Sequence, residues 1–284
     1  MPDNIVWYPG HMAKAKRELA ERASGADAVI ELLDARIPYS SQNPDIGAML
    51  PDKPRLTLVS KCSLADEECT AEWISLLRAG GRTVIPIDCK TGLGLNSVAP
   101  KIRAMLSDRI DRAAAKGRSI ILRAMVVGIT NVGKSTFINS FTKTSKAVAE
   151  DRPGVTRSMR WIASPYGIDL LDTPGLLWHK FDDPVVGLHL ALTGAIRDEV
   201  LDTLTLAVSL CGILRARFPD RLSARYGVTQ EDGEDDYGLF CRIARKRGML
   251  VSGGEVDEDR CARVLLDEFR AGKIGRITLD ELPA

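Results

Sequence analysis

A glycine-rich segment that ends in lysine and serine has the residue types and spacing of a phosphate-binding loop. The octapeptide Gly128-Ile129-Thr130-Asn131-Val132-Gly133-Lys134-Ser135 fits the pattern GxxxxGK[ST], follows an apolar run and can open a helix. Its glycines let backbone N–H groups curl around phosphate oxygens, while Lys134 reaches the β- and γ-phosphates and Ser135 offers a hydroxyl to Mg²⁺. A plain glycine-rich turn with a surface lysine is the alternative. We expect nucleoside triphosphate binding, with contacts from Asn131, Val132, Gly133, Lys134, Ser135 and Thr136.

Two further segments downstream of this loop supply oxygen ligands and a backbone amide. Asp172-Thr173-Pro174-Gly175 follows another apolar run, at a strand end where α/β sheets bind ligands. Asp172 can hold Mg²⁺ through water, and the Gly175 N–H can sense a γ-phosphate. Thr156, within Pro153-Gly154-Val155-Thr156-Arg157, is expected to add a hydroxyl ligand to the Mg²⁺. The alternatives are an ordinary Asp-Pro-Gly turn and a plain loop threonine.

Apolar runs alternate with helical patterns in the part of the chain that carries these motifs. They predict buried strands over 28–33, 56–59, 83–87, 120–127 and 167–171, with a helix over 67–77. This alternation is typical of an α/β fold with a mostly parallel sheet and helices on both faces. After about residue 181 the strand signals fade, and helical patterns such as 201–215 and 257–270 follow. We therefore expect an α/β domain over residues 1–180 and an all-α domain over residues 181–284, with His179 and His189 packed near their junction.

Composition places the chain among ordinary globular proteins. It has 284 residues, 45% hydrophobic and 27% charged, and 39 basic against 38 acidic residues give a formal net charge of +1. These values exclude a disordered or low-complexity chain, and no apolar run is long enough for a transmembrane helix. The first residues lack the pattern of a signal peptide, and the six cysteines form no CxxC pair. We expect a cytoplasmic location without disulfides or a zinc site.

Positive charge is clustered although the net charge is near zero. Seven lysines and arginines lie between Lys101 and Arg123, and shorter basic groups lie at 14–17 and 242–247. Each cluster can meet a nucleic-acid backbone, in which case binding weakens with salt. A solvated helix face is the alternative for any one of them. Together they make RNA a candidate partner.

The order of the motifs points to a rearranged GTPase. Segments that resemble the base-reading motifs NKxD and SAK precede the phosphate loop instead of following it: Ser60-Lys61-Cys62-Ser63 and Asp88-Cys89-Lys90. A circular permutation explains this order, because domain termini often lie close together and a chain can be reopened in a loop. Further stretches match the ribosome biogenesis GTPase A (YlqF-like) family, at 7–12, 34–38, 176–178, 194–196 and 272–279. The chain resembles that family over nearly its whole length.

This resemblance implies a circularly permuted P-loop GTPase that hydrolyses GTP with Mg²⁺. The family implies a cytoplasmic monomer that assists late assembly of the large (50S) ribosomal subunit and docks on ribosomal RNA through its helical domain. The expected catalytic set is His11, Lys134, Thr156 and Gly175. The expected base contacts are Ser60, Lys61, Ser63, Asp88, Cys89 and Lys90. In GTPases that use potassium the residue equivalent to Asn131 helps to hold K⁺, so K⁺ activation is expected as well.

The base-reading motifs depart from the family pattern at two positions. Ser60 and Ser63 stand where NKxD has its asparagine and the aspartate that accepts from guanine N1–H and N2–H₂. One hydroxyl cannot accept such a bidentate pair, and a neutral bond replaces a charge-assisted one worth about 1.5–3 kcal/mol. Lys61 is retained, and the Cys89 N–H can still donate to guanine O6. We expect a weakened preference for guanine, and relaxed selectivity toward ATP is the alternative.

The residue that orients the attacking water in many GTPases is also missing. Leu176 occupies that position, directly after Gly175, and an apolar side chain cannot hydrogen-bond water. The resemblance makes His11 of the Pro-Gly-His-Met segment the candidate replacement, through an imidazole that positions or accepts from water. Its alternatives are a structural cap and a direct RNA contact. Leu176 also leaves open a nucleotide-gated RNA-binding module with negligible turnover.

Overall fold

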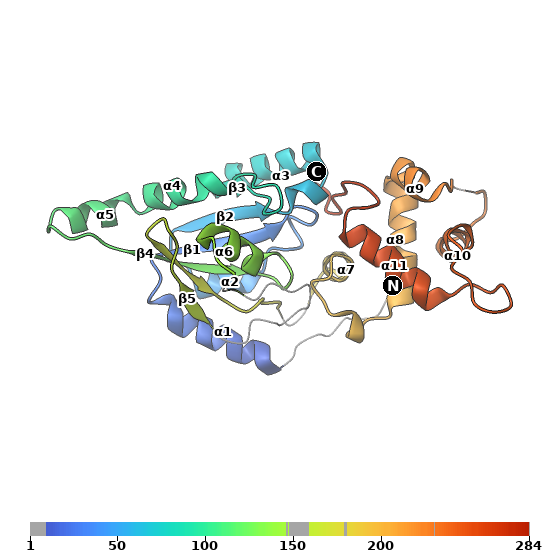
Figure 1. The fold of residues 1–284 in the computed structure, drawn as a ribbon, viewed down its shortest axis with the longest axis horizontal. Coiled ribbons are helices and arrows are strands. Elements are labelled where there is room, and N and C mark those ends of the chain that lie inside the picture. Colours follow the sequence, from blue (N-terminus) through green and yellow to red (C-terminus); the bar gives the residue numbers. More distant parts are fainter. Residues whose placement is uncertain (1–9, 146, 148–158, 179–180, 230, 284) are drawn as a thin grey trace.

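A six-stranded sheet organises the first part of the chain, in the order β3-β2-β1-β4-β6-β5 (Figure 1). The computed structural model describes residues 10–145, 147, 159–178, 181–229 and 231–283, with side chains described from residue 16 onward. Neighbouring strands are parallel except β5, which pairs antiparallel with β6. The strands are β1 (Ala28–Asp34), β2 (Arg55–Ser60), β3 (Thr83–Pro86), β4 (Leu122–Gly128), β5 (Arg160–Ile162) and β6 (Ile168–Asp172).

The central strands are buried on both faces, which explains why they read as continuous apolar runs. All seven residues of β1 are buried. Its Ile30 and Leu32 belong to one apolar core, whereas Val29 packs with Met125 of β4 in a second core. Successive side chains of a strand point to opposite faces, so these two cores lie on the two sides of the sheet.

Helices cover both of these faces. Those that accompany the sheet in the described residues are α1 (Gly10–Ala23), α2 (Pro44–Met49), α3 (Glu67–Ala79), α4 (Leu95–Met105), α5 (Ser107–Ala114) and α6 (Lys134–Thr142). Helices α4 and α6 pack on the face that carries Ile30, and α1, α2 and α3 pack on the opposite face. The predicted α/β class with helices on both faces is confirmed. Helix α5 has no buried residue and projects from the end of α4 (Figure 1).

A helical region follows the sheet and lies at the other end of the molecule from α5 (Figure 1). Its helices are α7 (Pro184–Leu192), α8 (Thr203–Arg217), α9 (Pro219–Tyr226), α10 (Asp236–Lys246) and α11 (Glu258–Arg270). Four of them begin at an aspartate whose carboxylate caps a backbone N–H, at Asp183, Asp202, Asp235 and Asp257. Beyond residue 181 the described part of the chain holds no strand, only an isolated bridge between Leu250 and Val256.

The chain returns from the helical region to the sheet at its end. The Ile277 N–H donates to Leu64 O at 3.1 Å, and the Leu279 N–H donates to Arg36 O at 2.7 Å. A single apolar core also runs from the sheet face into the helical region, where it includes Leu190 and Leu210. The two regions are therefore packed directly against each other.

Candidate functional site

The predicted motifs meet at one edge of the sheet, at the carboxyl ends of the parallel strands. β2 ends at Ser60, β4 at Gly128 and β6 at Asp172, and Asp88 follows the end of β3. This edge is where open α/β sheets bind their ligands. The structure thus brings the phosphate loop and both base segments together, although they are far apart in the sequence.

The phosphate loop has a backbone geometry that directs N–H groups toward an anion. Asn131 and Gly133 have positive φ angles of 55° and 103°, and α6 begins at Lys134. Lys134 is 7% exposed, and its ammonium donates to Gly128 O at 3.2 Å and to Ile129 O at 2.6 Å. Burial lowers the pKa of this ammonium to about 8. Backbone donors and a buried cation at the start of a helix make an anion site.

Asp172 is a buried carboxylate with an unused acceptor beside this loop. It is 2% exposed, and its Oδ1 has no hydrogen-bond partner within the described part of the chain. Burial raises the pKa of Asp172, and the ammonium of Lys134 opposes that rise. A buried acceptor without a donor suits a divalent cation, and Ser135 and Thr136 in the first turn of α6 carry hydroxyls. The residues present therefore fit Mg²⁺.

The segment after Asp172 is fastened to the phosphate loop. The Leu176 N–H donates to Gly128 O at 3.2 Å. Gly175 lies so close to Thr130 that a Cβ would stand 2.6 Å from the Thr130 Cα, so only glycine fits. The Leu176 side chain is 1% exposed and packs in the core on the α1 face. Leu176 therefore serves packing at a position where many GTPases carry a water-orienting polar group.

Three predicted groups cannot be assigned a role from the described residues. Thr156 lies outside them, and of His11 only the backbone is described, in the first turn of α1. Asn131 is described, and its side-chain nitrogen donates to Gly194 O at 2.7 Å. The roles of His11 in water activation, of Thr156 as a Mg²⁺ ligand and of Asn131 as a K⁺ ligand stay predictions.

The first base segment is tied to the phosphate loop through its side chains. The Ser60 hydroxyl donates to Val132 O at 2.7 Å. The Lys61 ammonium donates to Asn131 O at 2.6 Å and to Asp34 Oδ2 at 2.9 Å. Ser60 thus links the base segment to the phosphate loop with a single hydroxyl.

A buried ion pair lies behind Lys61 and was given no role by the sequence motifs. Asp34 and Arg36 are each 2% exposed, and their charged groups are 2.7 Å apart. Burial alone would raise the pKa of Asp34, but Arg36 and Lys61 hold it well below its usual range. Arg36 also donates to Arg270 O at 3.4 Å and Thr193 O at 3.5 Å. The pair connects the base segment to the helical region. Local patterns missed it because the partners of Arg36 in that region are distant in the sequence.

The second base segment folds around Asp88, which is 2% exposed. Its Oδ1 accepts from the N–H groups of Lys90 at 2.9 Å and Thr91 at 3.1 Å, and its Oδ2 accepts from the Ser63 N–H at 3.0 Å. Burial would raise the pKa of Asp88, but the Ser63 hydroxyl and these N–H groups lower it. The structure therefore joins Ser63 and Asp88 directly, which the sequence did not predict.

Two cysteines lie in these base segments. Burial raises the pKa of the Cys62 and Cys89 thiols to about 11, so both are neutral thiols near pH 7. All six cysteines of the chain are free. Among the described residues, no group of three or more His, Cys, Asp or Glu side chains is arranged to hold a metal ion.

The nucleotide edge and the helical region share direct hydrogen bonds. The Thr130 hydroxyl of the phosphate loop donates to Ala195 O, next to the bond from Asn131 to Gly194 O. Arg276 donates to Ala65 O at 2.6 Å, next to the Ser63 segment. Both nucleotide-binding segments are therefore in direct hydrogen-bond contact with the part of the chain that follows the sheet.

A buried polar cluster closes the junction of the two regions. His189 Nδ1 lies 2.7 Å from Asp280 Oδ1 and 3.3 Å from the Ser40 hydroxyl, and Asp280 also accepts from the Ser40 N–H at 2.8 Å. His189 is 5% exposed and packs at the junction, as the sequence predicted. His179 lies outside the described residues. Because one buried carboxylate holds both His189 and Ser40, this cluster is a structural clamp.

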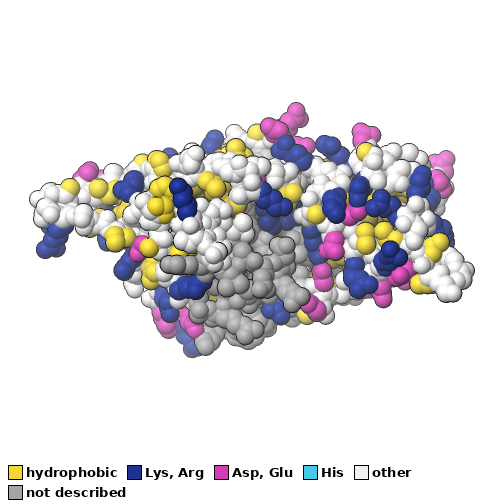
Figure 2. Space-filling model, viewed as in Figure 1, with side chains coloured by type: hydrophobic (Ala, Val, Ile, Leu, Met, Phe, Trp, Pro, Cys, Tyr) yellow, Lys and Arg dark blue, Asp and Glu magenta, His cyan; other side chains and the backbone are white. Residues whose placement is uncertain are grey.

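The basic cluster on α10 is used within the helical region. Arg242 forms ion pairs with Glu231 and Glu234 at 2.8 and 2.6 Å, and Arg247 pairs with Glu268 at 3.2 Å. Figure 2 shows Lys and Arg side chains interspersed with Asp and Glu over the visible face. The sequence predicted that the basic residues at 242–247 are available to contact a nucleic-acid backbone. Their ion pairs with acidic residues weaken that prediction, and a count of charges along the sequence does not reveal these partners.

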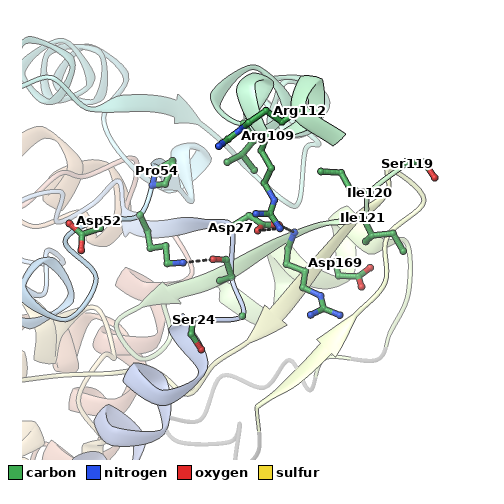
Figure 3. Close-up of a pocket in the computed structure, with 15 residues that line it drawn as sticks. Ser24, Asp27, Asp52, Pro54, Arg109, Arg112, Ser119, Ile120, Ile121 and Asp169 are labelled. Atoms are coloured by element: carbon green, nitrogen blue, oxygen red, sulfur yellow. Dashed lines mark hydrogen bonds and ion pairs between the residues drawn. The ribbon is translucent and has the colours of Figure 1, made fainter. Parts of the chain in front are cut away.

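A separate hollow of about 840 Å³ lies at the opposite edge of the sheet, where β1, β2 and β4 begin (Figure 3). It is lined by charges of both signs, including Arg109, which pairs with Asp27 at 2.9 Å, and Asp169. No part of the phosphate loop lines it. This hollow is therefore not the nucleotide site.

Comparisons with known proteins agree with this geometry. The sequence model described as "50S ribosome-binding GTPase" matches residues 123–213. Ribosome biogenesis GTPase A of Bacillus cereus is 43% identical over 277 residues, which cover 97% of this chain and 93% of that protein. Mitochondrial ribosome-associated GTPase 1 of Mus musculus is 31% identical, over 98% of this chain and 90% of that protein. A solved GDP-bound structure of TM YlqF has the same fold, with a TM-score of 0.65 at 23% identity, over 93% of this chain and 99% of that one.

The strand order and the site together define a circularly permuted P-loop GTPase, with its base segments on β2 and β3 ahead of the phosphate loop on β4. The chain belongs to the ribosome biogenesis GTPase A (YlqF-like) family. None of the helices in the described part of the chain combines the length and apolar character that crossing a membrane requires.

Proposed function

We propose that this GTPase assists assembly of the large ribosomal subunit in the cytoplasm, as a monomer whose contact with ribosomal RNA depends on the bound nucleotide. The names of the relatives support the ribosomal partner. The observation that carries the proposal is the pair of bonds from Thr130 and Asn131 to the carbonyl oxygens of Ala195 and Gly194. Through them the phosphate loop is bonded to the region that would dock on RNA.

The phosphate loop and its neighbours would hold the nucleotide through its phosphates. The backbone N–H groups from Val132 to Thr136 surround the phosphates, and Lys134 adds a positive charge against the β- and γ-phosphates. Ser135 and Asp172 would hold Mg²⁺, which neutralises phosphate charge when it is bound. The unpartnered Oδ1 of Asp172 supports this role.

The switch between nucleotide states would pass through Gly175 and Thr156. Gly175 stands against Thr130 without room for a side chain. A shift of its N–H toward a γ-phosphate would therefore move Thr130 with it. The Thr130 hydroxyl would carry that displacement to Ala195 in the helical region. Thr156 would add a second contact that exists only in the triphosphate form.

Water activation would depend on His11, because Leu176 is buried in the core and has no polar atom on its side chain. An imidazole can position or accept from water, and contact with the ribosomal subunit would bring it to the phosphates. Asn131 would help to hold K⁺ beside the phosphates. Hydrolysis would then be slow for the isolated protein and faster on the subunit.

The decisive experiment measures GTP hydrolysis by the full chain with Mg²⁺ and K⁺, alone and with purified large or small ribosomal subunits. We expect large subunits to stimulate phosphate release and to co-sediment the protein with a non-hydrolysable GTP analogue more than with GDP. Equal behaviour with both subunits, or sedimentation that ignores the nucleotide, would contradict the proposal. Thr130→Val is the matched variant, because it keeps the volume of the side chain and removes the bond to Ala195. It should weaken the difference between nucleotides.

A second candidate function is a nucleotide-gated RNA-binding module with negligible turnover, and the buried Leu176 favours it. One measurement distinguishes the two candidates, namely phosphate release in the presence of large subunits. Phosphate release that is stimulated by large subunits and lost in His11→Ala supports the GTPase cycle. Nucleotide-dependent sedimentation without any stimulated release supports the gated module.

A further inference from the structure

Residues 276–280, here called the return segment, are buried although they belong to no helix or strand. The exposed fractions are 1% for Ile277, 3% for Thr278, 0% for Leu279 and 4% for Asp280. A buried segment outside helices and strands must bond its backbone groups to other parts of the protein. Several of these partners lie in the loop that follows β2 and carries the first base segment.

Arg276 grips this loop at several points. Its Nε donates to Ala65 O at 2.6 Å, and another guanidinium N–H donates to Cys62 O at 3.2 Å. A third N–H donates to the Glu67 carboxylate at 2.9 Å, in the first turn of α3. One planar guanidinium therefore fixes the loop from its start to the helix that follows it.

The backbone and side chains that follow Arg276 add further bonds to the same loop. The Ile277 N–H donates to Leu64 O at 3.1 Å. The Asp66 N–H donates to the Thr278 hydroxyl at 3.2 Å. The loop after β2 is thus bonded to the return segment through both its carbonyl and its N–H groups.

The loop begins at a residue whose conformation depends on its surroundings. Lys61 has a φ of 60°, in the left-handed region that a non-glycine residue keeps only when neighbouring contacts impose it. A 3₁₀ turn, Cys62–Leu64, follows at once, and the return segment holds the carbonyl groups at both of its ends. On the other side the Lys61 ammonium donates to Asn131 O of the phosphate loop. The return segment therefore fixes the turn next to the residue that reaches the nucleotide edge.

We propose that Arg276 is a positioning residue of the base site, through which the return segment holds the base segment in the conformation that receives guanine. It acts through the carbonyl groups of Cys62 and Ala65, so its effect on binding is indirect. The inference rests on the expectation that the base segment contacts guanine. The coupling is reciprocal by linkage, so guanine binding must also stabilise the contacts of the return segment.

The first test measures dissociation constants on the full chain for GDP and for inorganic pyrophosphate, with Mg²⁺ and K⁺. Pyrophosphate can occupy the phosphate loop and has no base. Arg276→Met removes the donors to the base segment and should weaken GDP binding by about fivefold or more, with pyrophosphate binding within about twofold of wild type. Arg263→Met is the matched control, because Arg263 is an exposed arginine of α11 that donates to Asp259 O in its own helix. It should leave both constants unchanged.

The second test needs no variant, and it decides the question if Arg276→Met does not fold. Amide hydrogen exchange of the Ile277 N–H is measured on the wild-type chain with GDP or with pyrophosphate. Each ligand is added at the same multiple of its dissociation constant, so that both stabilise the whole fold equally. GDP should slow the exchange of this N–H about fivefold or more relative to pyrophosphate.

Two results would overturn the inference. In the first, Arg276→Met lowers the free energy of unfolding and leaves GDP binding unchanged, which means that Arg276 only supports the fold. In the second, the variant weakens GDP and pyrophosphate equally, or the two ligands protect Ile277 equally, which means that the return segment does not act on the base site.

A failure of the expected base contacts has its own signature. If the wild-type chain binds pyrophosphate as tightly as GDP, the base segment adds nothing to affinity, and the inference falls with that expectation. The assays contain no ribosomal subunits, so neither test bears on the proposed ribosomal role.

Discussion

The two halves of the nucleotide site differ in how closely they keep the family pattern. The phosphate half, from Gly128 to Ser135 with Asp172 and Gly175, keeps every motif residue. The base half replaces both the asparagine and the aspartate of NKxD, at Ser60 and Ser63. A phosphate is bound mainly by backbone N–H groups, whose positions depend on a fixed loop conformation. A base is read by side chains, whose identity the loop conformation does not fix in this way.

The largest expected effect is a loss of unfolding free energy when the buried Asp34–Arg36 pair behind the base segment is broken. Arg36→Met removes one partner of the buried pair with Asp34 and leaves that carboxylate with Lys61 alone, and breaking a buried pair in this way costs about 3–5 kcal/mol. Arg109→Met breaks the pair with Asp27 but replaces an arginine that is 54% exposed, so it should cost no more than about 1 kcal/mol. Denaturant unfolding of both variants gives the comparison. Equal costs would show that the Asp34–Arg36 pair does not anchor the base half.

The next effect separates phosphate binding from base reading. Lys134→Met removes the buried ammonium of the phosphate loop, and charge-assisted bonds of about 1.5–3 kcal/mol are lost. GDP and ADP should both bind about a hundredfold more weakly, with the ratio of their dissociation constants unchanged. Calorimetric titration of each nucleotide measures this. A changed ratio would mean that the two halves of the site are not separable.

Gly175 tests the contact between the switch and the phosphate loop. Gly175→Ala drives a Cβ to 2.6 Å from the Thr130 Cα, and overpacking of this kind costs about 1–3 kcal/mol of unfolding free energy. Gly47→Ala is the matched control, because nothing lies within 4 Å of its added Cβ. If thermal unfolding shows the two variants to be equally stable, the close approach of Gly175 to the loop is refuted.

The smallest expected effect is a dependence of nucleotide affinity on pH, which arises from Lys134 in the phosphate half of the site. Burial lowers the pKa of Lys134 to about 8, so the protein without nucleotide loses this charge as pH rises through that value. Phosphates favour the charged form, so nucleotide affinity should be constant below about pH 7 and fall about tenfold by pH 9. GDP and ADP should fall in parallel. Lys134→Arg, which stays charged, should give a flat profile, and a steep one would assign the dependence to another group.

Local patterns predicted the elements that are long and buried. The apolar runs at 28–33 and 56–59 correspond to β1 and β2, and the octapeptide at 128–135 correctly predicted a loop that opens α6. β5 was missed because it has three residues and pairs only at the sheet edge. α5 was missed because it is short and charged and buries no side chain.

The parts of the site that sequence reasoning missed depend on contacts between distant segments. Arg36 reaches carbonyl groups at Thr193 and Arg270, and Asp280 accepts from Ser40, so neither role is visible in a local motif. The spacing of Ser63 and Asp88 gave no sign that they touch, because their contact depends on the pairing of β2 with β3. The two residues were visible in the sequence, but the hydrogen bond between them was not.

The most direct test of this account is the ratio of the dissociation constants for GDP and ADP, measured on the purified wild-type chain with Mg²⁺ and K⁺. The account predicts that GDP binds at least about tenfold more tightly, a difference of about 1.4 kcal/mol, because the base segments after β2 and β3 still read guanine despite the serines at positions 60 and 63. Equal binding of the two nucleotides would contradict it and would make ATP a substrate of the same standing as GTP.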